Sequence, residues 1–74
     1  MKEEELLDYG FKKITYGIEL TINEFDSLWF YNSALYICGS DCPNEDYAIK
    51  TKINNIEDLK LMYKLISGKI LNKK

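Results

Sequence analysis

The segment LWFYNSALYIC, residues 28–38, decides the fold expected for this chain. It holds two runs of strand-favouring residues around Asn32-Ser33, a pair suited to a tight turn between antiparallel strands. Pairing Tyr31 with Ala34 across the turn sorts the side chains by type. One face receives Leu28, Phe30, Leu35 and Ile37, and the other receives Trp29, Tyr31 and Tyr36. Because a slip of one residue would mix the two sets, the pattern predicts this register.

Two further strands are expected around this hairpin. Residues 12–22 alternate with period two, so they predict one strand in which Gly17 marks a bulge. Residues 47–53 alternate in the same way and predict a last strand. A turn at 23–27 and a polar loop at 39–46, with Pro43-Asn44 at its tip, would join these strands as an antiparallel meander.

One helix is expected before these strands in the chain and one after them. Residues 3–9 predict a short helix that ends at Gly10 and brings Phe11 back towards Leu6. Asn55 is a helix cap, with Asp58 at the reciprocal position, and Ser67-Gly68 ends the helix. Its apolar stripe contains Ile56, Leu59, Met62, Tyr63 and Ile66.

Together these elements predict one α+β domain over residues 1–74. Its expected architecture is a four-stranded antiparallel meander, with the C-terminal helix packed on one face and a short N-terminal helix. A chain of 74 residues buries only about 60% of its unfolded surface, which leaves room for a single core. The residues predicted to be buried are Ile14, Ile18, Phe30, Ile37, Ile49, Leu59, Tyr63 and Ile66.

The composition argues against catalysis, cofactors and metal sites. The chain has no histidine, the commonest general base, and its serines lie in no nucleophile motif. Two cysteines alone cannot complete a structural zinc site, and the loop at 39–46 lacks the spacing of a calcium loop. We therefore expect no enzyme, no cofactor and no metal. Cys38 and Cys42 are expected as free thiols of a cytoplasmic protein, with a local disulfide as the alternative.

Location follows from the start of the chain and its longest uncharged stretch. Residues 1–9 are acidic, unlike the basic lead of a secretory signal. Residues 27–40 fall short of the roughly 20 apolar residues that span a bilayer. A cytoplasmic protein without a membrane partner is expected.

Two surfaces are candidates for binding a protein partner. Trp29, Tyr31 and Tyr36 should gather on the sheet face away from the long helix, and such aromatic residues are enriched among binding hot spots. The alternative is that the N-terminal helix covers them through Leu6 and Leu7. The second surface contains Leu61 and Leu65, four residues apart and turned away from the helical stripe. Scattered exposed leucines are also normal on protein surfaces.

Charge is divided unevenly along the chain. Residues 1–46 hold three lysines and ten acids, a balance of −7, whereas residues 47–74 hold seven lysines and two acids, a balance of +5. Phosphates could meet this lysine-rich C-terminal third, which makes nucleic acid an alternative partner. The absence of arginine, the residue best suited to bidentate phosphate contacts, favours a solvated basic face instead.

The run of residues 53–69, INNIEDLKLMYKLISGK, together with the start at Leu6 to Phe11, resembles small accessory proteins of phages and mobile elements. This resemblance of style covers about half of the chain and transfers no functional residue. It implies a protein that binds and inhibits a host protein, such as a defence or replication protein, in the host cytoplasm. We therefore expect a non-enzymatic protein-binding domain, monomeric or homodimeric. The alternatives are nucleic-acid binding and a structural subunit of a particle or homo-oligomer.

Overall fold

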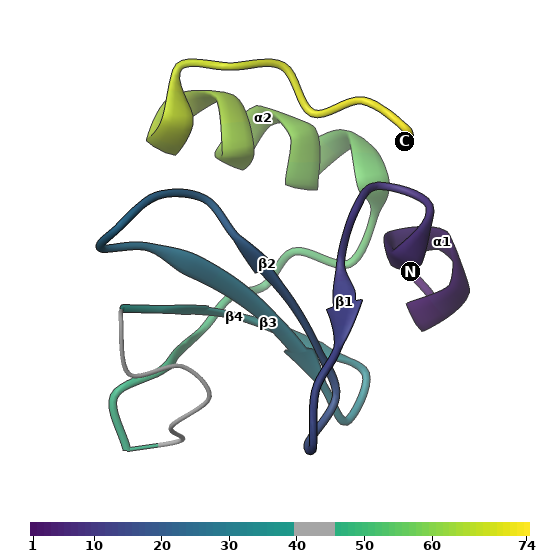
Figure 1. Ribbon diagram of the computed structural model, residues 1–74, viewed down its shortest axis with the longest axis vertical. Coiled ribbons are helices and arrows are strands. Elements are labelled where there is room, and N and C mark those ends of the chain that lie inside the picture. The colour runs from purple at the N-terminus through teal and green to yellow at the C-terminus, as the bar shows by residue number, and fades with distance from the viewer. Residues whose placement is uncertain (40–45) are drawn as a thin grey trace.

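A computed structural model describes residues 1–39 and 46–74 and shows an α+β domain. Its five strands form one antiparallel sheet in chain order, with α2 across one face and α1 near one end (Figure 1). The predicted class and helices are confirmed, but the strand count is five instead of four. The elements are α1 (Glu3–Leu7), β1 (Lys12–Lys13), β2 (Ile18–Thr21), β3 (Ser27–Tyr31), β4 (Ala34–Cys38), β5 (Ile49–Lys50) and α2 (Ile56–Ser67).

The central hairpin has the predicted register. Tyr31 pairs with Ala34, and the pairs Phe30 with Leu35, Trp29 with Tyr36 and Leu28 with Ile37 follow. Asn32 and Ser33 adopt φ values of 52° and 60°, the left-handed backbone of a type I′ turn. The twist of that turn matches the twist of the two strands, so the turn and the hydrophobic pattern specify the same pairing.

The strand predicted over residues 12–22 is broken, and this break supplies the fifth strand. Lys13 pairs with Ile18, and the Ile14 N–H donates to the Gly17 carbonyl at 3.1 Å, so β1 and β2 form a hairpin around residues 14–17. Gly17 has φ 87°, and a Cβ built there would collide with the Phe30 carbonyl oxygen. A residue with a side chain cannot occupy this turn without moving β3.

Helix α1 ends as the sequence predicts, although it is shorter than residues 3–9. Gly10 has φ 98°, the Phe11 N–H donates to the Leu6 carbonyl at 3.3 Å, and the Gly10 N–H donates to the Leu7 carbonyl at 3.2 Å. These two bonds are those of a Schellman motif, in which the residue after the glycine packs against the last turn. Leu6 and Phe11 accordingly both lie in the main core.

Helix α2 begins and ends at the predicted residues. The Asn55 side-chain oxygen accepts the Asp58 N–H at 2.9 Å, and Gly68 closes the helix with φ 73°. The segment after the helix was not anticipated: residues 69–74 run back beside α2, and the Lys74 N–H donates to the Asp8 carbonyl at 2.8 Å (Figure 1). Leu71 on this segment is buried in the core.

The main core lies between α2, α1 and the aliphatic face of the sheet. Of the residues predicted to be buried, Ile18, Phe30 and Leu59 are buried. Ile49 is 68% exposed, so its predicted burial is wrong. It lies outside the core cluster, on a strand that has a neighbour on one side only among the residues that the structure describes. The remaining members of the predicted set are half-buried, namely Ile14, Ile37, Tyr63 and Ile66.

Two alanine substitutions test the close approach at the β1–β2 turn. Gly68→Ala places a side chain at positive φ with no atom within 4 Å, so it should cost only the backbone strain of about 1–2 kcal/mol. Gly17→Ala adds a clash with the main chain of β3 and should cost about 1–3 kcal/mol more. Urea unfolding monitored by Trp29 fluorescence measures both values. Equal losses from the two variants would contradict the close approach.

Candidate interaction surfaces

Trp29, Tyr31 and Tyr36 gather on the sheet face away from α2, as strand alternation predicts. The Trp29 and Tyr31 rings stack with centroids 5.2 Å apart and planes 6° apart. Tyr36 packs on the other strand, with its ring centroid 5.0 Å from that of Trp29. We call this group, together with Tyr16 described next, the aromatic cluster.

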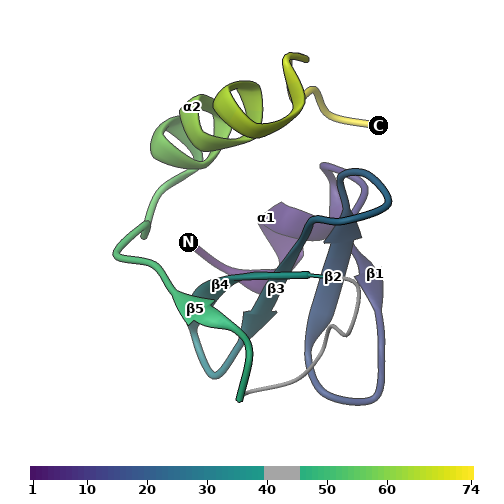
Figure 2. The same cartoon turned by 90° about the vertical axis from the view of Figure 1, so that its left-hand side faces the viewer.

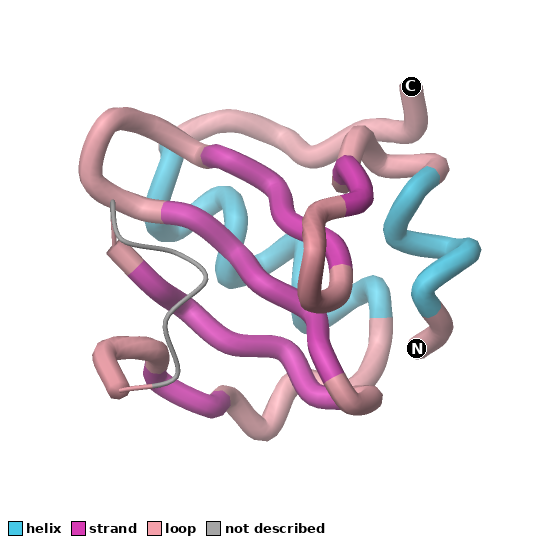
Figure 3. Tube along the Cα trace, turned by 60° about the horizontal axis from the view of Figure 1, so that its bottom comes forward, coloured by secondary structure: helices cyan, strands magenta, loops and turns pink. Residues whose placement is uncertain are grey.

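Tyr16 joins the cluster from the β1–β2 turn, which lies over the nearer face of the sheet in Figure 3. Its ring packs edge to face on the Tyr31 ring, with the two ring centroids 6.3 Å apart. Its main-chain carbonyl accepts the Trp29 indole N–H at 2.6 Å. This role of Tyr16 is absent from the sequence-based prediction, because the alternation over residues 12–22 predicts one continuous strand. Gly17, the residue next to Tyr16, was the available signal for a turn.

The aromatic cluster is a second small core rather than an open platform. Trp29 is only 2% exposed, so its ring offers almost no surface to a partner. The alternative prediction, that the N-terminal helix covers these aromatic residues, is also wrong. Leu6 and Leu7 pack with the main core on the opposite face. Tyr31 and Tyr36 are half-buried, and Tyr16 remains 61% exposed.

Leu61 and Leu65 form the most exposed apolar pair on a helix of this protein. They lie one turn apart on α2 with exposed fractions of 63% and 87%. Lys60 directly precedes Leu61, Lys64 directly precedes Leu65, and both lysines are also exposed. The Lys60 ammonium lies 5.3 Å from the centre of the Tyr9 ring, which holds this lysine beside the end of α1. We call Leu61, Leu65 and these two lysines the α2 outer face.

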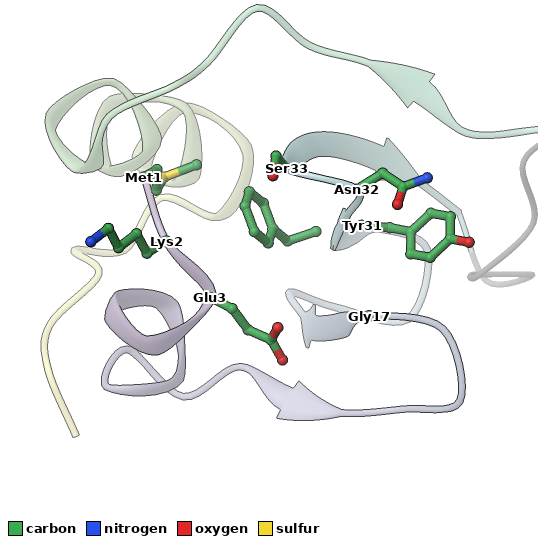
Figure 4. A pocket seen from close by; sticks show the side chains of 8 residues that line it. Met1, Lys2, Glu3, Gly17, Tyr31, Asn32 and Ser33 are labelled. Carbon is green, nitrogen blue, oxygen red and sulfur yellow. The ribbon is translucent and has the colours of Figure 1, made fainter.

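A shallow pocket of about 420 Å³ lies between the start of the chain and the turns at Gly17 and Asn32-Ser33 (Figure 4). In Figure 4 the Glu3 side chain extends towards the turn that carries Gly17, and the Tyr31 ring points away. The Met1 amino group donates to the Asn54 carbonyl at 3.1 Å, which anchors this end of the chain. Glu3 is the single carboxylate in the lining, so the pocket does not present a pair of acids.

No described part of the chain brings three or more His, Cys, Asp or Glu side chains together as a metal site would require. Cys38 is disulfide-bonded, so the expectation of a free thiol is wrong for this residue. The predicted turn at Pro43-Asn44 and the other cysteine, Cys42, lie outside the described residues. Neither α1 nor α2 nor any other described helix has the length and apolarity needed to cross a bilayer.

Comparisons of this chain with protein-family models, with curated proteins and with solved structures give no match. The resemblance to phage accessory proteins stays a prediction. What the protein binds has to be argued from its own surfaces. The two that the sequence predicts are Leu61 with Leu65, and Trp29 with Tyr31 and Tyr36.

Substitution of Trp29 tests whether the aromatic cluster is a core. Trp29→Ala removes a buried ring and should lower the free energy of unfolding by about 3–5 kcal/mol. Trp29→Phe keeps an aromatic ring but loses the indole donor to the Tyr16 carbonyl, so it should cost less than the alanine variant. Thermal unfolding followed by circular dichroism ranks the two variants. A loss below about 1 kcal/mol for Trp29→Ala would show that the ring is dispensable for folding.

Proposed function

We propose that this protein is a non-enzymatic protein-binding domain that presents the α2 outer face to its partner. The observation that carries the proposal is the exposure of Leu61 and Leu65 on a helix whose opposite stripe packs on the core. Folding does not account for these two side chains, because neither belongs to the core cluster. A pair of leucines at i and i+4 presents one continuous apolar ridge, unlike single scattered leucines.

Such a ridge suits a partner with an apolar groove, the mode in which a helix lays one face into a cleft. Burying each leucine contributes about 1.5–3 kcal/mol, so the pair supplies roughly 3–6 kcal/mol. A micromolar complex needs about 8 kcal/mol, and the remainder has to come from neighbouring groups. Lys60 and Lys64 both lie along one side of the ridge and would supply charge contacts to acidic groups at that rim of the groove.

The α2 outer face replaces the aromatic cluster as the first choice of binding surface. Strand alternation favoured the cluster because three aromatic residues converge there. The burial of Trp29 removes the residue with the largest potential contact area. Tyr16, Tyr31 and Tyr36 still offer partial surfaces, which makes them secondary contacts in this proposal.

The nature of the partner rests on the resemblance described above. Some small accessory proteins of phages bind and block host proteins, and a 74-residue domain with an exposed ridge suits that action. We infer that the partner is a host cytoplasmic protein, such as a defence or replication protein, whose activity is blocked by the contact. Nucleic acid is the rival partner, because residues 47–74 carry a balance of +5.

The proposal is tested by replacing both leucines with aspartate. The Leu61→Asp, Leu65→Asp variant should keep the wild-type free energy of unfolding within about 0.5 kcal/mol for each substitution, because both side chains are exposed. When wild type is immobilised and incubated with host lysate, it should retain a host protein that mass spectrometry identifies. The double variant should not retain that protein. Phe25→Asp is the matched control, since Phe25 is 73% exposed and lies in the β2–β3 turn. This variant should retain the same protein.

Two results would contradict the proposal. One is recovery of the same host protein by the double aspartate variant at wild-type yield. The other is binding of duplex DNA or RNA by wild type with a steep dependence on salt, left unchanged by the uncharged replacement Leu61→Ala with Leu65→Ala. That second result would assign the function to the lysines of the C-terminal third.

A further inference from the structure

Among the described residues β5 is the last strand of the sheet, and Figures 2 and 3 show it at the border of the molecule. The Thr51 N–H donates to the Leu35 carbonyl at 2.9 Å. Successive residues of an antiparallel strand alternate between the two sides of the strand, so the Lys50 N–H and C=O point away from β4. In the described part of the chain no strand lies beyond β5 to receive them.

An apolar side chain stands uncovered on the inner face of this edge. Ile49 pairs with Ile37 and points to the side of the sheet that carries the main core. It is nevertheless 68% exposed, and Ile37 is half-buried. The aliphatic face of the sheet therefore continues to the edge beyond the area that the helices cover.

Positive charge occupies the other face of the same edge. Lys50 pairs with Tyr36 and so lies on the face of the aromatic cluster, and it is exposed. Lys52 lies two residues further along the chain, so alternation places it on the same face, and it is exposed as well. An incoming strand would meet an apolar side chain on one face and lysines on the other.

We propose that the β5 edge binds an extended peptide segment of a partner protein, which adds a sixth strand beside Lys50. The segment alternates apolar residues, which cover Ile49, with acidic residues, which pair with Lys50 and Lys52. Main-chain hydrogen bonds to Lys50 provide affinity, and the alternating side chains provide selectivity, as in other cases of strand addition. Residues 48–52 offer about 17 Å of edge.

Charge decides against a second copy of this chain as the occupant. Pairing β5 with β5 of a copy across a two-fold axis would place Lys50 and Lys52 near the same lysines of the copy. Like charges opposite each other destabilise a strand pair, and edge lysines are a common protection against self-association. The lysines that exclude a copy are the groups that select an acidic strand.

This inference is independent of the α2 outer face and is tested with a synthetic probe. The probe is the acetylated and amidated peptide TEIEVET, titrated into the ¹⁵N-labelled protein. Saturable shifts are expected at the amides of residues 48–52, with at least tenfold slower hydrogen exchange at Lys50. The peptide TKIKVKT should bind at least tenfold more weakly, because its lysines face those of the edge.

Two variants complete the test. The Lys50→Glu, Lys52→Glu variant should reverse the preference between the two peptides, and Ile49→Thr should weaken TEIEVET at least fivefold. Because all three side chains are exposed, the variants should keep the wild-type amide spectrum outside the edge. The proposal is overturned if 1 mM TEIEVET produces no saturable shift at residues 48–52, or if both peptides bind equally. It is also overturned if the protein alone dimerises through β5 in sedimentation equilibrium.

Discussion

The turn at Asn32 and Ser33 holds both residues at positive φ, and this geometry determines which side chains of β3 and β4 face α2. Side chains alternate strictly along a strand, so one pairing register assigns every residue of the hairpin to a face. In the observed register the aliphatic residues and Phe30 face the helices, while Trp29 and its neighbours face away. A slip of β4 by one residue would turn Tyr36 towards the main core and place Leu35 and Ile37 on the aromatic face.

This division gives the small domain two cores instead of one. The helices and the tail through Leu71 cover the aliphatic face. No helix of residues 1–39 and 46–74 lies on the aromatic face, and the β1–β2 turn covers Trp29 there by bringing the Tyr16 carbonyl to its indole. That cover depends on Gly17, because only a residue without a side chain allows the turn to approach the main chain of β3 so closely. A chain of 74 residues in this way buries aromatic area on both sides of a single sheet.

Structural features that depend on a few neighbouring residues could be predicted from the sequence. Contacts between segments that are distant in the chain could not. The hairpin register, the Asn55 cap and the Gly10 end of α1 were predictable because each depends on neighbouring residues. Alternation over residues 12–22 identified the faces but not the break at Gly17, since a glycine fits a bulge and a turn equally. The burial of Trp29, the exposure of Ile49 and the burial of Leu71 each depend on which distant segment covers the residue. The burial of Trp29 decided the choice between the two candidate surfaces.

Both proposed surfaces lie outside the two cores, in the basic C-terminal third, and both require that the hairpin register be correct. The register determines that the aromatic face is closed around Trp29 and that Ile49, through Ile37, continues the aliphatic face. Cross-strand Hα–Hα nuclear Overhauser effects of the protein in solution test it most directly. The account predicts strong effects between Phe30 and Leu35 and between Leu28 and Ile37, the pairs without mutual hydrogen bonds. Strong effects between Phe30 and Tyr36, or between Trp29 and Leu35, would show a shifted register and contradict the account.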